Sequence, residues 1–267
     1  MTDQGQGDRH RSAGSSGPGD EDARYDFPPG AAPSQFYMVA STPRSGSHLV
    51  AHHLWRSGVM GAPLEYFNFY NFMFAMARRL RAGRFSEYLD ALMHVRTAPN
   101  GAFSFKAHYD QFVFLNMTGG LRRLRPLKIL SIERRDEVAQ AVSFAKALQT
   151  ESWNARDAPV AAPAYRFDQI AQCLRTVRRQ KTHWEETFRR LRVEPVRVVY
   201  EDFLLASEPT TDRVLAAFGL ERDSAFKIDL PLIERQFDAV NAEWIARFRR
   251  EAAERRSGAA TTGQPQA

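Results

Sequence analysis

The sequence predicts an α/β protein in which a central, mostly parallel sheet is covered by helices on both faces. One reason is that apolar runs of strand length alternate along the chain with segments of helical period. Another is that a polar, glycine-containing segment follows the first apolar run, at the strand end where ligands bind in parallel sheets. The chain has 267 residues, 43% of them hydrophobic, which suffices for one medium-sized domain with a large core.

Four apolar runs are the predicted strands. They span residues 36–41, 101–109, 127–134 and 196–203, and the third is the clearest because charges bound it. The segments between and after these runs have the apolar spacing or the end signals of helices. The predicted helices cover residues 45–58, 66–80, 85–98, 136–150, 167–193, 210–220 and 243–256.

The two ends of the chain are predicted to be tails around a single domain. Residues 1–34 are rich in Gly, Ser, Asp and Pro and lack the apolar core of a signal peptide. The domain is predicted over residues 35–250, with a C-terminal tail at 251–267. No run of about 18 apolar residues indicates a transmembrane segment, and the single cysteine, Cys173, excludes an intrachain disulfide and a Cys-rich zinc site. We expect a cytoplasmic protein.

The chain is basic, with 37 Lys and Arg residues against 31 Asp and Glu and a formal net charge of +6. This balance favours an anionic partner, such as nucleic acid, an anionic membrane or a polyanionic cofactor. Solvation by arginine explains it equally well, because the charge is spread along the chain. An Arg-rich segment at residues 175–192 is the only support for nucleic acid, and a solvated helix face accounts for it, so we expect no nucleic-acid partner.

The segment STPRSGS, residues 41–47, follows the first predicted strand and opens a helix. Gly46 permits a tight turn near a ligand, and the N–H groups at a helix start favour an anion. Ser45 and Ser47 add hydroxyl donors, and the Arg44 guanidinium suits phosphate or sulfate oxygens. The leading glycine and the Lys-[Ser/Thr] of the nucleotide triphosphate loop are missing. Taken alone, the pattern also fits a purely structural turn.

A second candidate site follows the third predicted strand. Arg134 ends that strand, and Ser143 lies nine residues later in the next helix, a rise of about 13 Å along a helix. A single phosphate bridging the two is one interpretation. The alternative is that Arg134 pairs with Asp136 and that Ser143 is a surface hydroxyl.

Together these motifs resemble PAPS-dependent sulfotransferases, PAPS being 3′-phosphoadenosine 5′-phosphosulfate. Five motifs occur in order within residues 36–250: STPRSGSHL, EYF at residues 65–67, the strand lysine Lys106, ER-x-D-x-x-x-QAVSF and a late IERQFD…EW. They are similar to the bacterial family that includes trehalose 2-sulfotransferase. The resemblance implies a P-loop-like, three-layer α/β fold and sulfuryl transfer from PAPS, without a metal, to an acceptor hydroxyl.

The resemblance also implies roles for the site residues. Residues 44–47, with His48 beside them, would hold the 5′-phosphosulfate, while Arg134 and Ser143 would hold the 3′-phosphate. Arg44 and Lys106 would be the catalytic cations, although a solvated strand-end lysine is an equal alternative for Lys106. His48 also suits packing on the first helix, as do His52 and His53.

Two residues compete for the role of the base that takes the acceptor proton. Glu65 matches the position of the family's glutamate, and its aromatic surroundings are expected to raise its pKa. A charge at a helix start is the alternative. His108, in Lys-Ala-His, resembles the Lys-x-His of the eukaryotic cytosolic sulfotransferases, with a core or surface histidine as the alternative. We favour Glu65, with His108 as the second candidate or as its partner.

In the family pattern an acidic residue precedes the proline of the acceptor loop. In this sequence Ala62 stands at that position, so the sequence departs from the pattern there. We therefore predict a carbohydrate, a glycolipid or another hydroxyl compound as the acceptor, and not trehalose in particular. Aromatic residues at 66–74 would stack on sugar rings or hold a lipid, but they suit a core or a homodimer contact as well. The alternative functions are an ATP-dependent small-molecule kinase of the P-loop type and a basic nucleic-acid-binding protein.

Overall fold

A four-stranded parallel sheet lies at the centre of the protein, in the strand order β2-β1-β3-β4. The computed structural model describes residues 22–69, 72–153, 158–223 and 238–261. The predicted parallel α/β sheet is confirmed. Its strands are β1 (Gln35–Ala40), β2 (Ala102–Ala107), β3 (Leu127–Glu133) and β4 (Val196–Val199).

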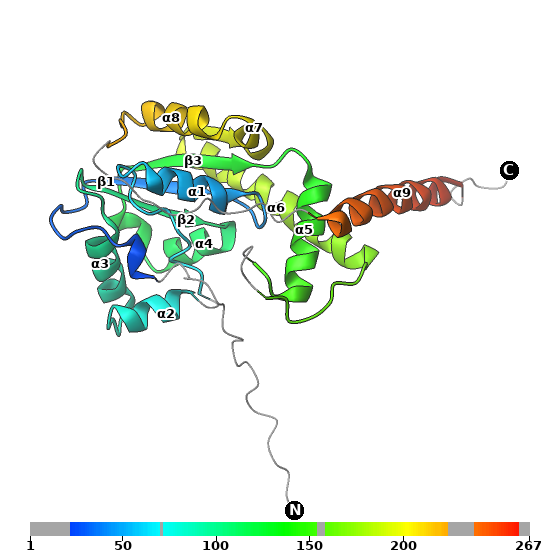
Figure 1. Ribbon diagram of the computed structural model, residues 1–267, viewed down its shortest axis with the longest axis horizontal. Coiled ribbons are helices and arrows are strands. Elements are labelled where there is room, and N and C mark those ends of the chain that lie inside the picture. Colours follow the sequence, from blue (N-terminus) through cyan, green and yellow to red (C-terminus); the bar gives the residue numbers. More distant parts are fainter. Residues whose placement is uncertain (1–21, 70–71, 154–157, 224–237, 262–267) are drawn as a thin grey trace, which may run out of the picture.

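Helices cover both faces of the sheet, as predicted (Figure 1). On one face α1 (Ser47–Arg56) packs against α8 (Ser207–Ala217), and on the other α4 (Tyr109–Met117) packs against α6 (Phe167–Leu191). The connection from β1 to β2 and the connection from β2 back across β1 to β3 run in opposite directions along the sheet. Because connections between parallel strands are right-handed, these two place their helices on opposite faces. The remaining helices are η1 (Ala23–Tyr25), α2 (Phe72–Arg79), α3 (Phe85–Arg96), η2 (Gly120–Arg123), α5 (Glu137–Thr150), α7 (Tyr200–Leu205) and α9 (Ala239–Thr261).

The register of the central strand determines where the loops meet. The last residue of β1, Ala40, pairs with Ala107 of β2 and with Ser131 of β3. Tyr37, Met38 and Val39 have no exposed surface, since both faces of β1 are covered. The loops after β1, β2 and β3 therefore leave the sheet at one edge, which lies beside α5 in Figure 1.

A smaller core joins three helices beyond this edge. Ala139 of α5, Ile170 and Cys173 of α6, and Trp244 and Phe248 of α9 form one buried cluster. Cys173 is a buried small side chain, as predicted, and this burial raises the pKa of its thiol to about 11. The cluster fixes α5 against α6, and α5 borders the candidate site.

Two predicted elements have different bounds in the structure. The predicted strand 196–203 ends at Val199, and the chain turns directly into α7. There the Glu201 carboxylate accepts hydrogen bonds from the backbone N–H groups of Arg135 and Asp136, which a continued strand would not permit. The predicted helix 66–80 is shortened to α2, because Tyr66 and Phe67 belong to the core. Residues 70–71 lie outside the described residues.

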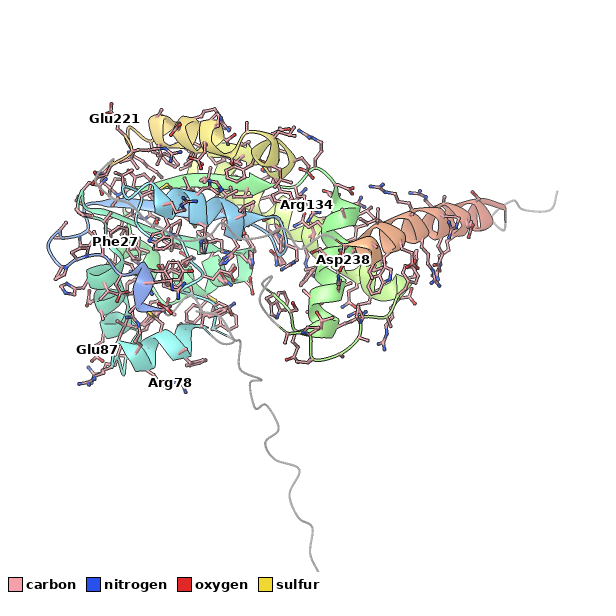
Figure 2. The ribbon with its side chains drawn as sticks, in the orientation of Figure 1. Phe27, Arg78, Glu87, Arg134, Glu221 and Asp238 are labelled. Atoms are coloured by element: carbon pink, nitrogen blue, oxygen red, sulfur yellow. The ribbon has the colours of Figure 1, made fainter. Side chains whose placement is uncertain are left out.

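The described residues include segments on either side of the predicted domain bounds at residues 35 and 250. Before residue 35, Tyr25 and Phe27 are buried in the main core, and Figure 2 labels Phe27. Asp26 binds the fully buried Arg96 at 3.2 Å and so ties this segment down. After residue 250, α9 continues to Thr261. Within the described ranges, no helix combines the length and the apolar character needed to cross a bilayer.

Candidate active site

The loop after β1 forms an anion cradle at the start of α1. Gly46 is the N-cap residue of α1 with φ +86°, and no side chain caps this helix start. The first N–H groups of the helix are therefore available to an anion. The Ser45 hydroxyl is fully buried and has no hydrogen-bond partner among the described residues. A buried hydroxyl donor beside a helix start fits a phosphate or sulfate group.

Tyr200 packs beneath this cradle and connects it to Arg134. A Cβ atom on Gly46 would lie 2.0 Å from Cδ2 of the Tyr200 ring, so only glycine fits. The Arg134 guanidinium lies 5.2 Å from the centroid of the same ring and donates to the carbonyl of Arg44 at 3.1 Å. Figure 2 shows Arg134 at the carboxyl ends of the strands, close to α5. The structure thus brings the second predicted site next to the first.

The Arg44 side chain joins the two predicted phosphate sites. Its Nε donates to the Ser143 hydroxyl at 3.0 Å, and a terminal nitrogen donates to the carbonyl of Trp153. Ser143 is 8% exposed, so it is not a surface hydroxyl. Asp136 caps α5 and binds Arg249 at 2.8 Å. Arg44 was assigned to the 5′-phosphosulfate, but its guanidinium extends toward the residues assigned to the 3′-phosphate.

Two buried side chains that the sequence did not single out hold the cradle. Gln140 of α5 donates to the Thr42 hydroxyl and to the Pro43 carbonyl, each at 2.7 Å. Trp184 of α6 donates from its indole nitrogen to the Ser41 carbonyl at 2.9 Å. The available signal for Gln140 was an amide between two alanines in a predicted helix, where a buried polar group would need partners.

Glu65 lies at the centre of a second cluster, opposite the end of β2. Its Oε1 lies 2.8 Å from Nζ of Lys106 and 3.5 Å from Nε2 of His108. Its Oε2 accepts hydrogen bonds from Gln111 at 3.1 Å and from Asn68 at 3.3 Å. The Glu65 loop is held beside β2 because the backbone N–H of Lys106 donates to the Leu64 carbonyl at 2.8 Å. Glu65, Lys106 and His108, predicted as catalytic, therefore form one cluster.

The expectation that the surroundings of Glu65 raise its pKa is wrong. Burial does act in that direction, but the charges of Lys106 and His108 and the hydrogen bonds from Lys106 and Gln111 outweigh it. The pKa of Glu65 is lowered well below its ordinary value. The sequence pattern showed the aromatic neighbours Tyr66 and Phe67, but these point into the core. Glu65 is thus a firmly ionised carboxylate held by a buried lysine, which is only 2% exposed.

His108 contacts Glu65 and also the loop after β1. Its Nδ1 lies 3.1 Å from the Ser41 hydroxyl while Nε2 faces Glu65. His108 is also the N-cap residue of α4, so its position is fixed by both the sheet and the helix. A histidine held this way orients the carboxylate, and the two candidate bases are neighbours.

His48 lies between the two clusters on the first turn of α1. Burial, and next to it the charge of Lys106, lowers the pKa of His48 to about 3, so its ring is neutral at pH 7. The ring packs at 4.7 Å from that of His52, and His52 faces the Tyr25 hydroxyl at 3.3 Å. His52 and His53 are buried, which confirms their packing role.

A family model and two curated relatives are similar to this chain. The model of the Stf0 sulphotransferase family matches residues 123–251, which include Arg134 and Ser143. The trehalose 2-sulfotransferase of Mycolicibacterium smegmatis is 29% identical over 256 residues, covering 81% of this chain and 95% of the relative. The trehalose 2-sulfotransferase of Mycobacterium tuberculosis is 28% identical over 257 residues, with the same coverage.

Two solved structures are also similar. One is the sulfotransferase domain of the Synechococcus PCC 7002 olefin synthase, with a TM-score of 0.43, 16% identity and coverage of 74% of this chain and 78% of that one. The other is a sulfotransferase from Alicyclobacillus acidocaldarius, with a TM-score of 0.45, 14% identity and coverage of 82% and 93%. The fold assignment rests on the strand order described above and not on these two likenesses.

The family match and the curated relatives show that the chain is a sulfotransferase-like protein. Among sulfotransferases it is trehalose 2-sulfotransferase-like, because the two curated relatives of that name match it over 81% of its length. The resemblance seen in the motifs is confirmed.

Replacing Gly46 with alanine should destabilise the protein by more than the strain of its left-handed backbone conformation alone. The added Cβ would meet the Tyr200 ring, so we expect Gly46→Ala to cost well over 2 kcal/mol of unfolding free energy, about the upper limit for left-handed strain alone. Gly219→Ala is the matched control, since Gly219 has φ +73° and open space around it; it should cost about 1 kcal/mol. Urea unfolding measures both values, and equal losses would contradict the packing described.

The lowered pKa of Glu65 predicts a dependence of stability on pH. A carboxyl with a lowered pKa stabilises the fold fully above its ordinary value of 4.5, and this contribution declines as the pH falls. Glu65→Gln leaves Lys106 buried without its charged partner, so it should cost about 3 kcal/mol at pH 7. Below pH 4.5 we expect the difference in unfolding free energy between Glu65→Gln and the unsubstituted protein to become smaller, as measured by urea unfolding.

The control for this series is Glu194→Gln, at a side chain that is 90% exposed. It should change the unfolding free energy by no more than about 0.5 kcal/mol at any of these pH values. A Glu65→Gln gap that widened with acidification would show that the pKa shift has the opposite sign.

Proposed function

We propose that the protein transfers a sulfuryl group from PAPS to a hydroxyl of a carbohydrate or glycolipid acceptor. The observation that carries the proposal is the contact of Arg44 with Ser143, together with that of Arg134 with the Arg44 carbonyl. It joins a helix-start anion cradle to a second group of anion-binding side chains on the same edge of the sheet. PAPS carries phosphates at both the 3′ and the 5′ positions of its ribose, whereas ATP lacks the 3′-phosphate.

In the proposed complex the cradle holds the 5′-phosphosulfate. The N–H groups at the start of α1 and the buried Ser45 hydroxyl supply its donors, with Ser47 and His48 beside them on the first turn. Arg134 and Ser143 bind the 3′-phosphate, and Arg44 lies between the two groups. The guanidinium groups of Arg44 and Arg134 suit these oxygens because they donate in a fixed fork.

The Glu65 cluster is proposed to activate the acceptor. In the reaction the acceptor oxygen bonds to sulfur, the bond from sulfur to the bridging oxygen breaks, and the hydroxyl proton passes to Glu65. Lys106 is the cation nearest to Glu65, and it can serve the sulfuryl oxygens, where negative charge needs stabilisation. As Lys106 turns to those oxygens, Glu65 loses its counter-ion and becomes a better base. His108 and Gln111 keep its carboxylate in place.

The proposed acceptor class follows from the curated relatives, whose names specify trehalose. Trehalose is accordingly the first sugar to assay. Ala62 is fully buried, and its carbonyl accepts a hydrogen bond from the Tyr66 hydroxyl at 2.6 Å, so its side chain is not available to a sugar. A different sugar or a glycolipid is therefore included in the proposal.

Donor binding is tested without an acceptor. By calorimetry in the absence of metal, 3′,5′-diphosphoadenosine should bind at least about tenfold more tightly than 5′-AMP, because the 3′-phosphate gains charge-assisted hydrogen bonds. Arg134→Ala should erase the difference. Arg135→Ala is the matched control, since its exposed guanidinium binds Asp202 on the surface. Equal binding of the two nucleotides to the unsubstituted protein would overturn the proposal.

The base is tested by transfer assays with an acceptor found by screening sugars and glycolipids. Glu65→Gln should lower kcat by at least about 100-fold, the usual minimum for a general base, while the affinity for 3′,5′-diphosphoadenosine stays within threefold. His108→Ala should have a smaller effect. Asp110→Asn, a carboxyl-to-amide change on the exposed side of α4, should leave kcat unchanged. Loss of activity in His108→Ala with activity kept in Glu65→Gln would assign the base to His108.

A further inference from the structure

A basic surface around the start of α3 has no role in the function proposed so far. It is formed by the end of α2, by the turn that joins α2 to α3, and by η2 with the residues after it. The exposed arginines on these segments are Arg78, Arg81, Arg84, Arg122, Arg123 and Arg125. We call this set the arginine surface. Figure 2 shows Arg78 at the lower left of the molecule, with Glu87 of α3 on the same side.

Hydrogen bonds to the start of α3 bring the separate parts of the arginine surface together. The Arg123 guanidinium, at the end of η2, donates to the Ser86 carbonyl at 3.5 Å. The next residue of α3, Glu87, accepts hydrogen bonds from the backbone N–H groups of Gly83 and Arg84 at 3.0 and 3.1 Å. Because both segments bind neighbouring residues of α3, η2 and the turn before α3 lie side by side.

Positive charge exceeds negative charge on the arginine surface. Within the described part of the chain, its ion pairs join Arg84 to Glu87 at 3.9 Å and Arg123 to Asp90. The other arginines of the set form no ion pair with a described residue. Like charges that are gathered on one surface repel each other, so this arrangement favours an anionic partner.

Two exposed apolar side chains accompany these arginines. Phe74 is 57% exposed and lies four residues before Arg78, so both side chains are on the same face of α2. Met117 is 81% exposed and is the last residue of α4, directly before η2. Proteins that bind membrane surfaces combine such residues, because basic groups attract anionic headgroups while apolar groups enter the acyl boundary. The phosphates of a nucleic acid offer no apolar partner, so a bilayer suits this surface better.

The arginine surface is connected to the candidate active site through α2. The backbone N–H of Met73, in the first turn of α2, donates to the Asn68 carbonyl at 3.0 Å. The Asn68 side chain in turn donates to Glu65 at 3.3 Å. Because α2 has only 8 residues and is about 12 Å long, its arginine-bearing end lies close to the Glu65 cluster.

We propose that the arginine surface binds an anionic lipid bilayer, with Phe74 and Met117 entering the boundary between headgroups and acyl chains. Each arginine close to such a bilayer increases the affinity about fivefold. The inference goes beyond the proposed function and does not depend on it. It does bear on the acceptor, because a bilayer bound here would present a glycolipid about one helix length from the Glu65 cluster.

The test measures co-sedimentation of the full-length protein with lipid vesicles. Vesicles of phosphatidylcholine mixed with phosphatidylglycerol should bind the protein, and vesicles of phosphatidylcholine alone should bind it at least about tenfold more weakly. Raising the salt concentration from about 0.1 M to about 1 M should release most of the bound protein, because the Debye length falls from about 10 Å to about 3 Å.

Charge reversal locates the binding surface. The double variant Arg78→Glu, Arg122→Glu should weaken binding to the phosphatidylglycerol vesicles at least about twentyfold, since two fivefold contributions are lost. The matched control is Arg175→Glu, Arg179→Glu, which makes the same change of net charge at exposed residues of α6 near Cys173. The control should weaken binding by less than about threefold, because charges distant from the bilayer are screened.

The apolar contribution is measured separately. Phe74→Ser should weaken binding to the phosphatidylglycerol vesicles about tenfold, because the ring no longer leaves water for the acyl boundary. Leu205→Ser is the control at a side chain of α7 that is 87% exposed, and it should leave binding unchanged. All of these variants alter exposed side chains, so we expect the fold to persist.

Three outcomes would overturn the inference. One is equal binding, or no binding, to the two kinds of vesicle. Another is an equal loss of binding in the two charge-reversed pairs, which would show that net charge and not this surface is responsible. The third is binding to duplex DNA but not to phosphatidylglycerol vesicles, which would make the arginine surface a nucleic-acid site. Each leaves the proposed function standing, because donor binding is measured without lipid.

Discussion

The parallel pairing of β1 with both β2 and β3 is the constraint on which the candidate site depends. Because Ala40 is level with Ala107 and Ser131, the segments that follow these strands leave the sheet at the same edge. Residues from distant parts of the chain meet there. Gln140 and Trp184 then hold the loop after β1 through its own carbonyl groups, so the cradle is fixed by helices packed on the sheet.

The two clusters at this edge divide the proposed chemistry. One consists of guanidinium, hydroxyl and backbone N–H groups, which suits a ligand with separated anionic groups. The other has a carboxylate held by Lys106, His108 and Gln111. A strongly ionised carboxylate accepts a proton poorly, so the proposed reaction requires that donor binding draw Lys106 away from Glu65. Lys106 is the proposed link because it forms the ion pair with Glu65.

Strands and helices with a clear apolar period were predicted correctly from the sequence, as in β3 and α6, because burial on a sheet imposes that period directly. Errors arose where a local pattern was ambiguous. The apolar run after Val196 continued past the end of β4, since hydrophobicity alone does not show that Glu201 must turn to bind the N–H groups of Arg135 and Asp136. Tyr66 and Phe67 had the composition of a helix face but fill the core ahead of α2.

The sequence by itself determined the fold class, the order of the motifs and the identity of most candidate residues, because period, glycine position and motif order are local properties. Only the tertiary structure decided how those residues meet. Contacts between Arg44 and Ser143, or between Glu65 and Lys106, join residues 99 and 41 positions apart. The pKa of Glu65 follows from such contacts, which is why its sequence neighbours predicted the wrong direction. Electrostatic shifts depend on distances in space, and no local pattern records them.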